Sequence, residues 1–447
     1  MIMPRPAIRV IPAAIVLALA AACGGAPESP QQNGDCGSFG PYQGHSGTSV
    51  TIGSPIRDVE SDNLARAWER FESCTGINIE HRGSDTFEVD LPQQVAAGTP
   101  PDLAFMPQPG LITQLARQGA LKPVPGPVKA LAEQGWSQDW LKYATVDGNL
   151  YAVPADANVK SLVWYSPRMF AERGYTVPKT WDEMLQLSDR IAADGMKPWC
   201  AGIAAGGATG WPATDWLEDT LLRSSGPEVF DAWVAHTIPF NDPRVLAALE
   251  QVGAILRNPA FVNGGYDGVA SIPTIGFQEG GLPILEGRCA MHRQASFYSS
   301  FWPGDARIAE DGDIYAFYLP TMTAQPTSAE QPKPVLVAGT FLGAFSDRPE
   351  VTAVSAYLST AEFANERARF AQSVSANQGL DPNNFSQPVA RFAAELLAEP
   401  NVVLRFDGSD LMPAEVGTGT FWRGMTEWFT GRSSADVLAE VERSWPT

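Results

Sequence analysis

The 447-residue sequence lacks the short motifs that mark several enzyme classes. It contains no GxSxG nucleophile elbow, no Walker phosphate loop and no GxGxxG motif after a predicted strand. Its four histidines lie far apart and form no HExxH motif; they are His45, His81, His236 and His292. These absences argue against the common hydrolase, nucleotide-binding and zinc-protease patterns. We therefore expect no catalytic residue, no metal site and no cofactor.

Basic residues are scarce relative to acidic ones. The chain has 31 Lys and Arg against 50 Asp and Glu, which is a formal net charge of −19. Loss of a basic N-terminal segment that holds Arg5, Arg9 and no acid would change this charge from −19 to −21, since two positive charges leave with it. A strongly negative protein repels nucleic acids and other polyanions, so neutral or cationic ligands are favoured.

Long hydrophobic runs are missing after the N-terminus. The apolar run from Val10 to Ala22 is too short for a membrane-spanning helix, which needs about 20 residues. Because Arg5 and Arg9 precede this run, the sequence predicts a signal peptide over residues 1–22 and an exported protein. The whole chain is also too long for one compact core, so two large domains are expected.

The apolar run ends in LAAAC at Cys23, which is similar to a bacterial lipoprotein box, although Leu19 lies one position earlier than usual. We expect lipidation of Cys23 and a location at the outer face of the bacterial cell membrane. Residues 23–47 would form a flexible tether, because their first part is rich in Gly, Pro, Gln and Ser. The alternative is an ordinary signal peptide cut after an A-x-A site, with Cys23 incidental.

Four further cysteines remain: Cys36, Cys74, Cys200 and Cys289. An even number in an exported protein predicts disulfides, for which three pairings exist. Metal binding is the alternative, but the cysteine spacings fit no zinc pattern.

Residues 146–199 carry the clearest local signals in the chain. Asp147-Gly148 predicts a tight turn before a short strand that Pro154 ends. Residues 161–165 (SLVWY) are an apolar run typical of a buried strand. Residues 155–160 lie between these strands and have no hydrophobic periodicity, so we interpret them as a connector between two folded units.

A helix follows at Thr180, which begins the sequence TWDE. This pattern predicts a capping box, in which the Thr180 hydroxyl caps the helix while Glu183 reaches back to the N–H of the cap residue. Met184, Leu187 and Ile191 repeat at helical spacing and define its buried face.

The motifs VDGxLYAVP, LVWYxP and PxTWxE occur in this order. The series resembles the extracellular solute-binding proteins of carbohydrate ABC importers, the maltose-binding-protein-like group. GRCAMHRQASF resembles the segment that builds one wall of the sugar cleft in that family, and SVSANQGLDPNNF followed by LMPAE and TFW resembles its closing region. ATGWPATDWLED together with CAMHRQASF is more similar to the α-glucoside-binding branch. The likeness covers nearly all of residues 48–447.

The resemblance implies an α/β, two-lobed, periplasmic-binding-protein-like fold of type II. Each lobe would be a mixed or mostly parallel sheet flanked by helices, and a hinge would join the lobes. With chain crossings near Ala155 and Pro320, we place lobe one at residues 48–156 plus 320–358 and lobe two at 157–319 plus 359–447. The pairing Cys36–Cys74 and Cys200–Cys289 is then preferred, because it keeps each bridge inside one lobe.

Three further predictions concern secondary structure. Ser61 or Asp62 is expected to cap a helix that ends at Gly76. Residues 202–226 are rich in glycine and aromatic residues and are expected to be irregular. Residues 335–345 (VLVAGTFLGAF) predict a buried pair of strands.

Sugar binding uses flat aromatic faces that pack on pyranose rings. Trp211 lies in a Gly/Pro-rich segment and is the first candidate, with a loop anchor packed on its lobe as the alternative. Trp216 is a second candidate. The resemblance implies stacking roles for Phe297 and Trp422, with ordinary core as the alternative for Phe297, whereas Phe421 is interpreted as core. Alanine at Trp211 or Trp422 is expected to weaken binding and leave the melting temperature close to wild type.

Sugar binding also uses charged or amide groups that make directional bonds to hydroxyls. The polar candidates lie mostly in loops after predicted strands and are Arg57, Asp58, Asp85, Gln108, Asp215, Arg293 and Gln294. The alternative for Arg57 and Asp58 is that they belong to a solvated loop. Asp215 could instead cap a helix, and Arg293 could instead form a salt bridge. Asp156 lies at the first crossing and is interpreted as a hinge residue.

The resemblance implies a monomeric binding protein that captures a di- or oligosaccharide, an α-glucoside by its branch, between two lobes. It would deliver this ligand to the membrane permease subunits of an ABC importer. The main alternative is an exported glycan-acting enzyme, because Asp215, Glu218 and Asp219 supply the carboxylates that a glycosidase needs. A binding protein for peptides or polyamines would suit the negative charge but would not need so many loop aromatics. No nucleic-acid partner is expected.

Overall fold

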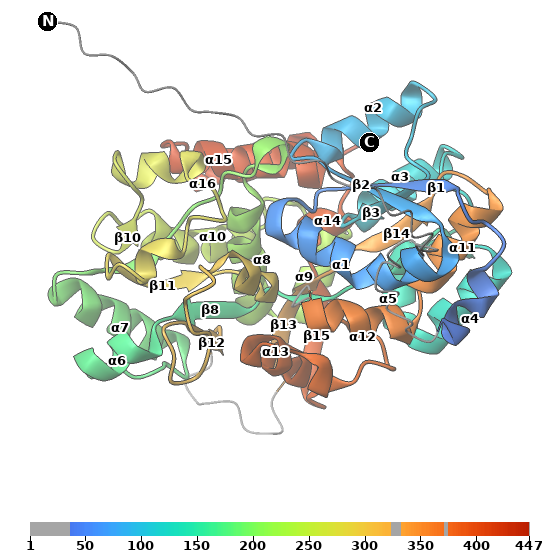
Figure 1. Cartoon of the computed structure of the whole chain (residues 1–447). Helices are drawn as coiled ribbons and strands as arrows, with labels where there is room; N and C mark the ends of the chain where they lie inside the picture. Colours follow the sequence, from blue (N-terminus) through green and yellow to red (C-terminus); the bar gives the residue numbers. More distant parts are fainter. Residues whose placement is uncertain (1–35, 323–331, 371–373, 447) are drawn as a thin grey trace, which may run out of the picture.

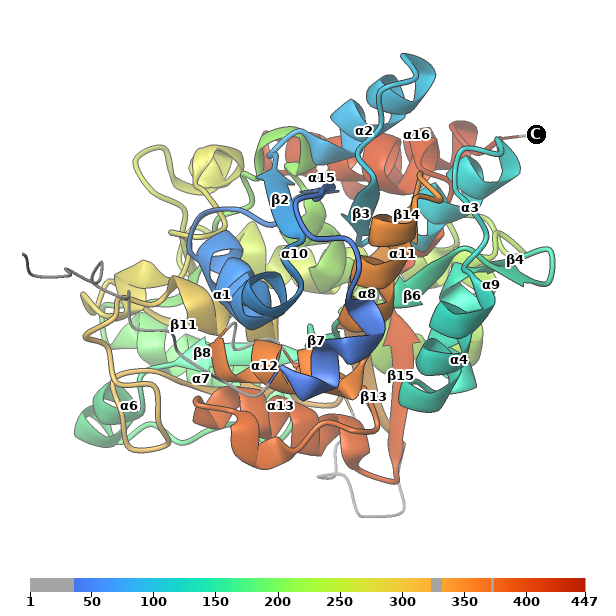
Figure 2. The same cartoon turned by 45° about the vertical axis from the view of Figure 1, so that its right-hand side comes forward.

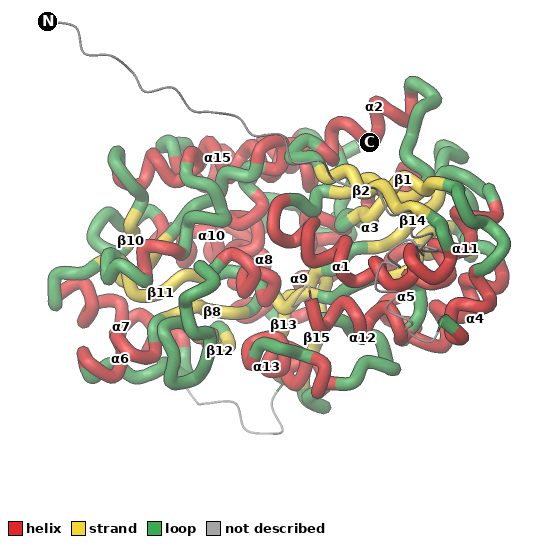
Figure 3. The backbone as a smooth tube through the Cα atoms, in the orientation of Figure 1, coloured by secondary structure: helices red, strands yellow, loops and turns green. Residues whose placement is uncertain are grey.

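The computed structural model describes residues 36–322, 332–370 and 374–446. The predicted signal peptide and Cys23 lie outside these ranges, as does part of the predicted tether. The described strands form two five-stranded sheets, a three-stranded sheet and a two-stranded hairpin. Figure 1 and Figure 3 show the two larger sheets at opposite sides of an elongated molecule, with β13 and β15 between them.

The first five-stranded sheet has the order β2-β1-β3-β14-β6. Its first three strands are parallel, and β14 runs antiparallel to both of its neighbours. The strands are β1 (Ser49–Ser54), β2 (Asn78–Gly83), β3 (Leu103–Met106), β6 (Ala152–Pro154) and β14 (Phe341–Ala344). The helices on this side are α1 (Asp58–Thr75), α2 (Phe87–Ala96), α3 (Pro109–Arg117), α4 (Gly126–Gly135), α5 (Gln138–Leu141), α11 (Pro349–Leu358) and α12 (Ala361–Phe370).

The second five-stranded sheet repeats this pattern in the order β10-β9-β11-β8-β12. Here too the first three strands are parallel and the last two alternate in direction. The strands are β8 (Leu162–Tyr165), β9 (Lys197–Cys200), β10 (Val262–Asn263), β11 (Cys289–Arg293) and β12 (Tyr315–Tyr318). The helices on this side are α6 (Pro167–Arg173), α7 (Trp181–Ala193), α8 (Trp211–Ser225), α9 (Pro227–Val234), α10 (Pro243–Leu256), α15 (Trp422–Phe429) and α16 (Ser434–Arg443). The prediction of mixed α/β sheets flanked by helices is confirmed.

Both chain connections between the strands of the two larger sheets pass through the three-stranded sheet. It pairs β13 (Lys333–Ala338) with β15 (Val402–Phe406) and β7 (Asn158–Val159). The chain passes from β6 through β7 to β8, and from β12 through β13 to β14. The connector expected at residues 155–160 therefore contains a strand of this central sheet.

The last two α-helices, α13 (Pro388–Ala398) and α14 (Gly408–Leu411), lie near this centre, and Figure 2 shows α13 beneath β13 and β15. The strands β4 (Thr145–Val146) and β5 (Asn149–Leu150) form a separate hairpin. The residue boundaries of the two lobes stay a prediction. The structure packs α12, which that prediction puts in lobe two, against α1, which it puts in lobe one.

The buried apolar residues form two clusters, of which the first covers the first large sheet and the central sheet and extends to Trp164 and Ala316 of the second sheet. On α1, Leu64, Trp68 and Phe71 recur at helical spacing and are buried, and Phe71 stacks on Tyr357 of α11 with ring centroids 4.4 Å apart. The second core contains the buried Trp199 of β9 and aromatic residues from α8, α9 and α15. Two separate cores are what a chain of this length needs, because one core does not grow beyond about 250–300 residues.

Both expected disulfides are present. Cys36–Cys74 ties the segment before β1 to the end of α1, with Cα atoms 5.6 Å apart. Cys200–Cys289 joins the end of β9 to the start of β11, with Cα atoms 5.5 Å apart. The preferred pairing of the four cysteines is thus confirmed.

The predicted start of α1 is wrong. The helix begins at Asp58, after Arg57 in extended conformation, and no side chain caps it. Ser61 lies inside the first turns, where its hydroxyl hydrogen-bonds to His81 Nδ1 at 2.8 Å instead of capping. The predicted end is confirmed, because Gly76 takes a left-handed conformation (φ 72°) that glycine adopts without strain.

Two other expectations are also wrong. Much of the segment 202–226 is the helix α8, whose residues from Pro212 to Leu222 are all buried. A helix buried on every side has no polar stripe, so the periodicity that reveals a surface helix is absent. Residues 335–345 do form two strands, but β13 and β14 belong to different sheets and do not pair.

The capping box at Thr180 is only half formed. Thr180 Oγ1 accepts a hydrogen bond from Glu183 N at 3.2 Å, as predicted. The Glu183 carboxylate accepts instead from Lys179 N at 2.7 Å, one residue before the cap.

Candidate ligand-binding site

A cleft lies between the two large sheets and is closed at its base by the central sheet. It encloses about 1250 Å³ of space up to its open mouth. From the first sheet its lining residues follow β1, β2 and β3, where the carboxyl ends of parallel strands meet at one edge. The lining from this side and the centre is Pro55, Ile56, Arg57, Asp58, Glu60, Ser84, Asp85, Glu88, Pro107, Gln108, Asp156, Asn158, Lys160, Ala338, Gly339, Thr340 and Arg367. The rest is Ala205, Ala208, Trp211, Phe277, Gln278, Phe297, Phe301, Asp407, Asp410 and Trp422.

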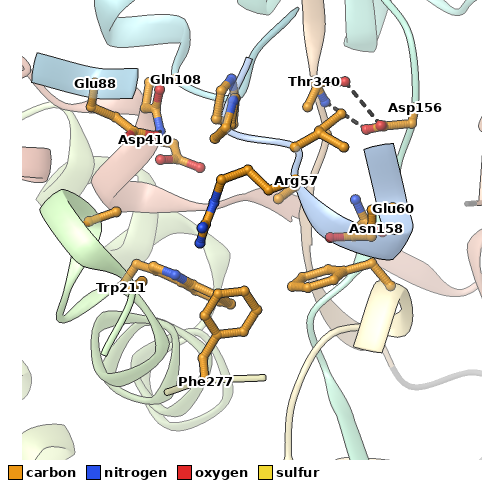
Figure 4. A pocket seen from close by; sticks show the side chains of 18 of the residues that line it. Arg57, Glu60, Glu88, Gln108, Asp156, Asn158, Trp211, Phe277, Thr340 and Asp410 are labelled. Atoms are coloured by element: carbon orange, nitrogen blue, oxygen red, sulfur yellow. Dashed lines mark hydrogen bonds between the residues drawn. The ribbon is translucent and has the colours of Figure 1, made fainter. Parts of the chain in front are cut away.

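One wall of the cleft is aromatic. Trp211 is the first residue of α8, and its ring lies 5.2 Å from that of Phe277 and 6.0 Å from that of Phe297. Phe301 packs edge-on against Phe277 at 5.5 Å. Figure 4 shows Trp211 and Phe277 at the same side of the cavity, opposite Gln108 and Asp156. The rings thus form a continuous apolar surface on which a flat ligand face can pack.

An acceptor-rich corner faces this wall. Gln108, which follows β3, is only 3% exposed and donates its Nε2 hydrogen to Glu88 Oε1 at 3.3 Å. Its Oε1 has no hydrogen-bond partner among the described residues. Burial raises the pKa of Glu88, and it raises that of Asp410 well above the ordinary range. Figure 4 shows the Gln108 side chain between those of Glu88 and Asp410.

The other polar end of the cleft contains a cation, Arg367, which is paired with Asp156. Asp156 accepts hydrogen bonds from Thr340 N at 2.7 Å and from Arg367 Nη2 at 2.5 Å. Burial raises the pKa of the nearby Glu60 to about 8, although the positive charge of Arg367 opposes this rise. Asn158, on β7, supplies an amide at the same end. This end can therefore both donate and accept hydrogen bonds.

Arg57 extends into the middle of the cavity (Figure 4). No ion pair or side-chain hydrogen bond of its guanidinium is found within the described ranges. It precedes Asp58, whose φ of +53° is a left-handed conformation that a residue other than glycine adopts only at some cost. Backbone strain of this kind often accompanies ligand-contacting loops.

A paired network of charges lies directly behind the cleft wall. Lys160 Nζ is 2.7 Å from Asp215 Oδ1 and also forms an ion pair with Asp407. Burial alone would raise the pKa of Asp407, but the Lys160 ammonium outweighs it and holds that pKa at about 2. Arg293 Nη2 is 3.0 Å from Asp219 Oδ2, and Asp219 also pairs with Arg223. This network joins the segment between β7 and β8 to α8, to β11 and to the cap residue of α14, and it holds the floor of the cleft in place.

The structure contains no group of three or more His, Cys, Asp or Glu side chains placed to hold a metal ion within residues 36–322, 332–370 and 374–446. Over the same residues no helix is both long and apolar enough to cross a bilayer.

Comparison with known proteins identifies the family. Residues 59–276 match the family model for bacterial extracellular solute-binding proteins. The chain is 41% identical over 399 residues to the osmoprotective compounds-binding protein GgtB of Synechocystis, covering 89% of this chain and 92% of that protein. It is 40% identical over 410 residues to the alpha-glucosides-binding periplasmic protein AglE of Rhizobium meliloti, covering 89% and 87%. This chain is a bacterial extracellular solute-binding protein.

The fold agrees with this membership. The crystal structure of the bacterial solute receptor AcbH superimposes with a TM-score of 0.75 at 19% sequence identity and covers 90% of this chain and 97% of that one. Maltose-bound MalE3 of T. maritima gives 0.68 at 19% identity. The predicted two-lobed periplasmic-binding-protein fold of type II is confirmed.

Within this solute-binding protein, the structure brings seven of the eleven predicted ligand contacts to the cleft lining. They are Arg57, Asp58, Asp85, Gln108, Trp211, Phe297 and Trp422. Arg57, Asp58, Asp85 and Gln108 were predicted from loop positions, Trp211 from its Gly/Pro-rich segment, and Phe297 and Trp422 from the family resemblance. Whether each contacts ligand stays a proposal.

Four predicted contacts do not line the cleft: Asp215, Trp216, Arg293 and Gln294. Asp215 and Arg293 are engaged in the paired network, which is the salt-bridge alternative considered for Arg293. Trp216 packs edge-on against Trp199 at 5.3 Å in the second core. Gln294 is buried beside β8, where its backbone N donates to Leu162 O. Asp215 and Trp216 are buried because α8 is covered on every side, and Arg293 and Gln294 are buried at the end of β11, all of whose residues are buried.

Sequence reasoning missed several cleft residues, among them Glu60, Glu88, Lys160, Phe277 and Asp410. Lys160 and Asp407 lie 247 positions apart, and no local pattern brings them together. A signal for Phe277 was present in the sequence. It is an aromatic residue that directly follows a glycine, Gly276, as Trp211 follows Gly210. Asp156 was assigned to the hinge and in fact both lines the cleft and bonds to residues of the second crossing.

Proposed function

We propose that this protein is the substrate-binding component of a carbohydrate ABC importer and that it captures an α-glucoside of two or more sugar units. The observation that carries the proposal is the cleft itself, in which an aromatic wall faces polar side chains that include the buried Gln108, whose Oε1 has no hydrogen-bond partner among the described residues. Such a surface suits a pyranose, whose C–H faces are apolar and whose hydroxyls need hydrogen bonds. The likeness to AglE, named for alpha-glucosides, supports the linkage.

The decisive experiment is a binding screen that compares linkages. Maltose and trehalose are titrated by calorimetry beside the β-linked disaccharides cellobiose and lactose as matched controls. We expect binding of at least one α-glucoside with little or no binding of the β-linked pair. Binding confined to the β-linked sugars would contradict the α-glucoside assignment, and no sugar binding at all would contradict the carbohydrate function.

The same samples test the enzymatic alternative. Each bound sugar is incubated with the protein and the mixture is separated by chromatography. We expect the sugar to be recovered intact, since the proposal needs capture and release only. Products that increase with protein concentration would favour a glycan-acting enzyme.

Ligand capture is proposed to proceed by hinge closure, because both connections between the large sheets run through the central sheet. The two sides already touch at one point, where Gly207 N donates to Asp85 O at 2.8 Å. Ligand would stabilise the closed form, in which both sides contact it. Solution scattering should show a smaller radius of gyration with saturating sugar, and an unchanged curve would count against closure.

Lipid anchoring at Cys23 is also proposed, from the LAAAC sequence alone. A Cys23→Ala variant should be released from the membrane fraction, because the acyl chains supply the attachment. Identical fractionation of variant and wild type would contradict lipidation.

A further inference from the structure

The two polar ends of the cleft differ in their supply of positive charge. Seven carboxyl groups and three basic groups line the cavity. Arg367 is bound to Asp156 at one end, and Lys160 is engaged with Asp215 and Asp407 behind the other. No ion pair to Glu88 or Asp410 occurs in the described parts of the chain. The corner made by Glu88, Gln108 and Asp410 therefore has two carboxyl groups for which the described residues supply no ion-pair partner.

This corner consists almost entirely of hydrogen-bond acceptors. Glu88 and Asp410 contribute carboxyl groups, and beside them lies the side chain of Gln108, which is 97% buried and whose Oε1 has no partner among the described residues (Figure 4). A buried acceptor without a donor costs free energy, so the corner is incomplete without a ligand. A sugar hydroxyl supplies one donor and satisfies one of these three side chains. An ammonium group has three donors and a positive charge, so it can satisfy all three at once.

We propose that the corner formed by Glu88, Gln108 and Asp410 is a subsite for a protonated amino group, and that the preferred ligand is an amino-substituted glucoside. The proposal rests on the carbohydrate function above and names the ligand class within it. It agrees with the formal net charge of −19, which favours neutral or cationic ligands. Burial also raises the pKa of Glu88 and Asp410, as expected where a carboxylate lacks a compensating cation.

The aromatic wall across the cavity fits the same ligand. Trp211 presents its ring on the opposite side of the cleft, where Lys160 Nζ already lies 5.0 Å from the ring centroid. An aromatic face attracts cations as well as C–H groups, so the wall does not select against a charged sugar. Arg57 makes no ion pair in the described part of the chain. If its guanidinium turned to Asp410 on ligand binding, the corner would be neutralised and neutral sugars would be preferred.

The test compares neutral sugars with their amino derivatives. Maltose and trehalose are titrated by calorimetry at pH 7 beside derivatives in which the hydroxyl at C2, C3, C4 or C6 of one ring is replaced by an amino group. We expect at least one derivative to bind about tenfold or more tightly than its parent, because charge-assisted hydrogen bonds are the stronger kind. Derivatives that all bind no better than their parents would overturn the proposal.

Matched variants assign the preference to the corner. Glu88→Gln, Asp410→Asn and the double variant keep the shape and remove the negative charge, whereas Asp139→Asn removes an exposed charge outside the cleft. The measured quantity is the ratio of amino-derivative to parent affinity, which remains meaningful if overall affinity falls. We expect the ratio to drop to about one in the double variant and to be unchanged in Asp139→Asn.

The possible failures are distinguishable. A preference that survives in the double variant would overturn the assignment to this corner while leaving the carbohydrate function intact. If neither parents nor derivatives bind, the proposed function fails and this inference falls with it. Should the double variant fail to fold by circular dichroism, the single Glu88→Gln variant decides, because a glutamine there still accepts the Gln108 hydrogen bond.

Discussion

Lys160 and Asp215, behind the cleft wall, form a buried ion pair with a nitrogen–oxygen distance of 2.7 Å. Gln108 and Asp410 of the same cleft are also buried and Glu88 is half-buried, yet no described cation forms an ion pair with these carboxyl groups and the Gln108 Oε1 has no partner among the described residues. Both clusters put polar groups into a low-dielectric environment, which is costly unless they are paired. The first is satisfied within the chain and serves the fold, whereas the second is left for a ligand to satisfy.

The two cleft tryptophans differ in the same way. Trp211 is half-buried and belongs to an aromatic wall that faces the cavity. Trp422 is only 3% exposed, and the backbone of Gly210 packs against it so closely that a Cβ at Gly210 would lie 2.2 Å from Trp422 O. Sequence reasoning gave both tryptophans one role, but the structure puts the Trp211 ring in the wall of the open cleft and packs Trp422 largely into the fold.

The largest effect should come from breaking the paired cluster. Lys160→Met leaves the Asp215 and Asp407 carboxylates buried beside each other without their cation. Removing one partner of a buried pair typically costs about 3–5 kcal/mol, so we expect a loss of that size in the free energy of unfolding. Urea denaturation measures it. Lys142→Met, which breaks an exposed pair with Asp139, should cost under about 1 kcal/mol, and equal losses in both variants would refute the comparison.

Trp422→Ala should come next, with a loss of about 3–4 kcal/mol in the free energy of unfolding, because it leaves a cavity among buried residues. This replaces the expectation from sequence that its melting temperature would stay close to wild type. Thermal and urea unfolding of the unliganded protein measure the loss. A wild-type melting temperature would show that Trp422 serves ligand binding alone.

Acid should lower the free energy of unfolding through His292, a buried residue of β11. Its Nδ1 donates to Cys200 O at 3.1 Å, its Nε2 lacks a partner among the described residues, and burial lowers its pKa from 6.5 to about 4. The unfolded chain takes up this proton at higher pH, so the stabilisation is complete above pH 6.5 and is lost as the pH falls toward 4. The total is about 2–3 kcal/mol.

Urea unfolding of the wild type and of His292→Gln between pH 7 and pH 4 isolates this contribution. The difference in unfolding free energy between the two proteins should shrink by about 2–3 kcal/mol as the pH falls. A difference that is constant with pH would show that His292 does not titrate in this range.

Trp211→Ala should have the smallest effect on the fold and a clear effect on the ligand. Loss of a packed aromatic anchor typically costs about 2 kcal/mol in binding, which is roughly a thirtyfold weaker affinity. The unliganded melting temperature should stay close to wild type, because the ring lines an open cleft. Calorimetric titration and melting of the same samples measure both. A lowered melting temperature with normal affinity would place Trp211 in the core with Trp422.

Sequence patterns predicted those features that depend on neighbouring residues. The turn at Asp147-Gly148, the cap at Thr180 and the helix stop at Gly76 are local, and the structure confirms each. The start of α1 and the second half of the Thr180 capping box were wrong, because a side chain that can cap also has other partners. Ser61 bonds to His81, twenty positions away, and no local rule weighs that contact.

The order of motifs along the sequence by itself determined the family, the two-lobed fold and the pairing of the four cysteines. Loop positions after predicted strands also made Arg57 and Gln108 candidates, because the ends of parallel strands converge at one edge of a sheet, and a Gly/Pro-rich segment made Trp211 a candidate. Only the tertiary structure decided which polar residues are paired. Asp215 resembled a ligand contact until α8 proved buried on every side, and Glu88 and Asp410 lie 322 positions apart and come together only in the folded chain. Burial and pairing depend on contacts between distant segments, and those contacts set the energy of a charge far more than its sequence neighbours do.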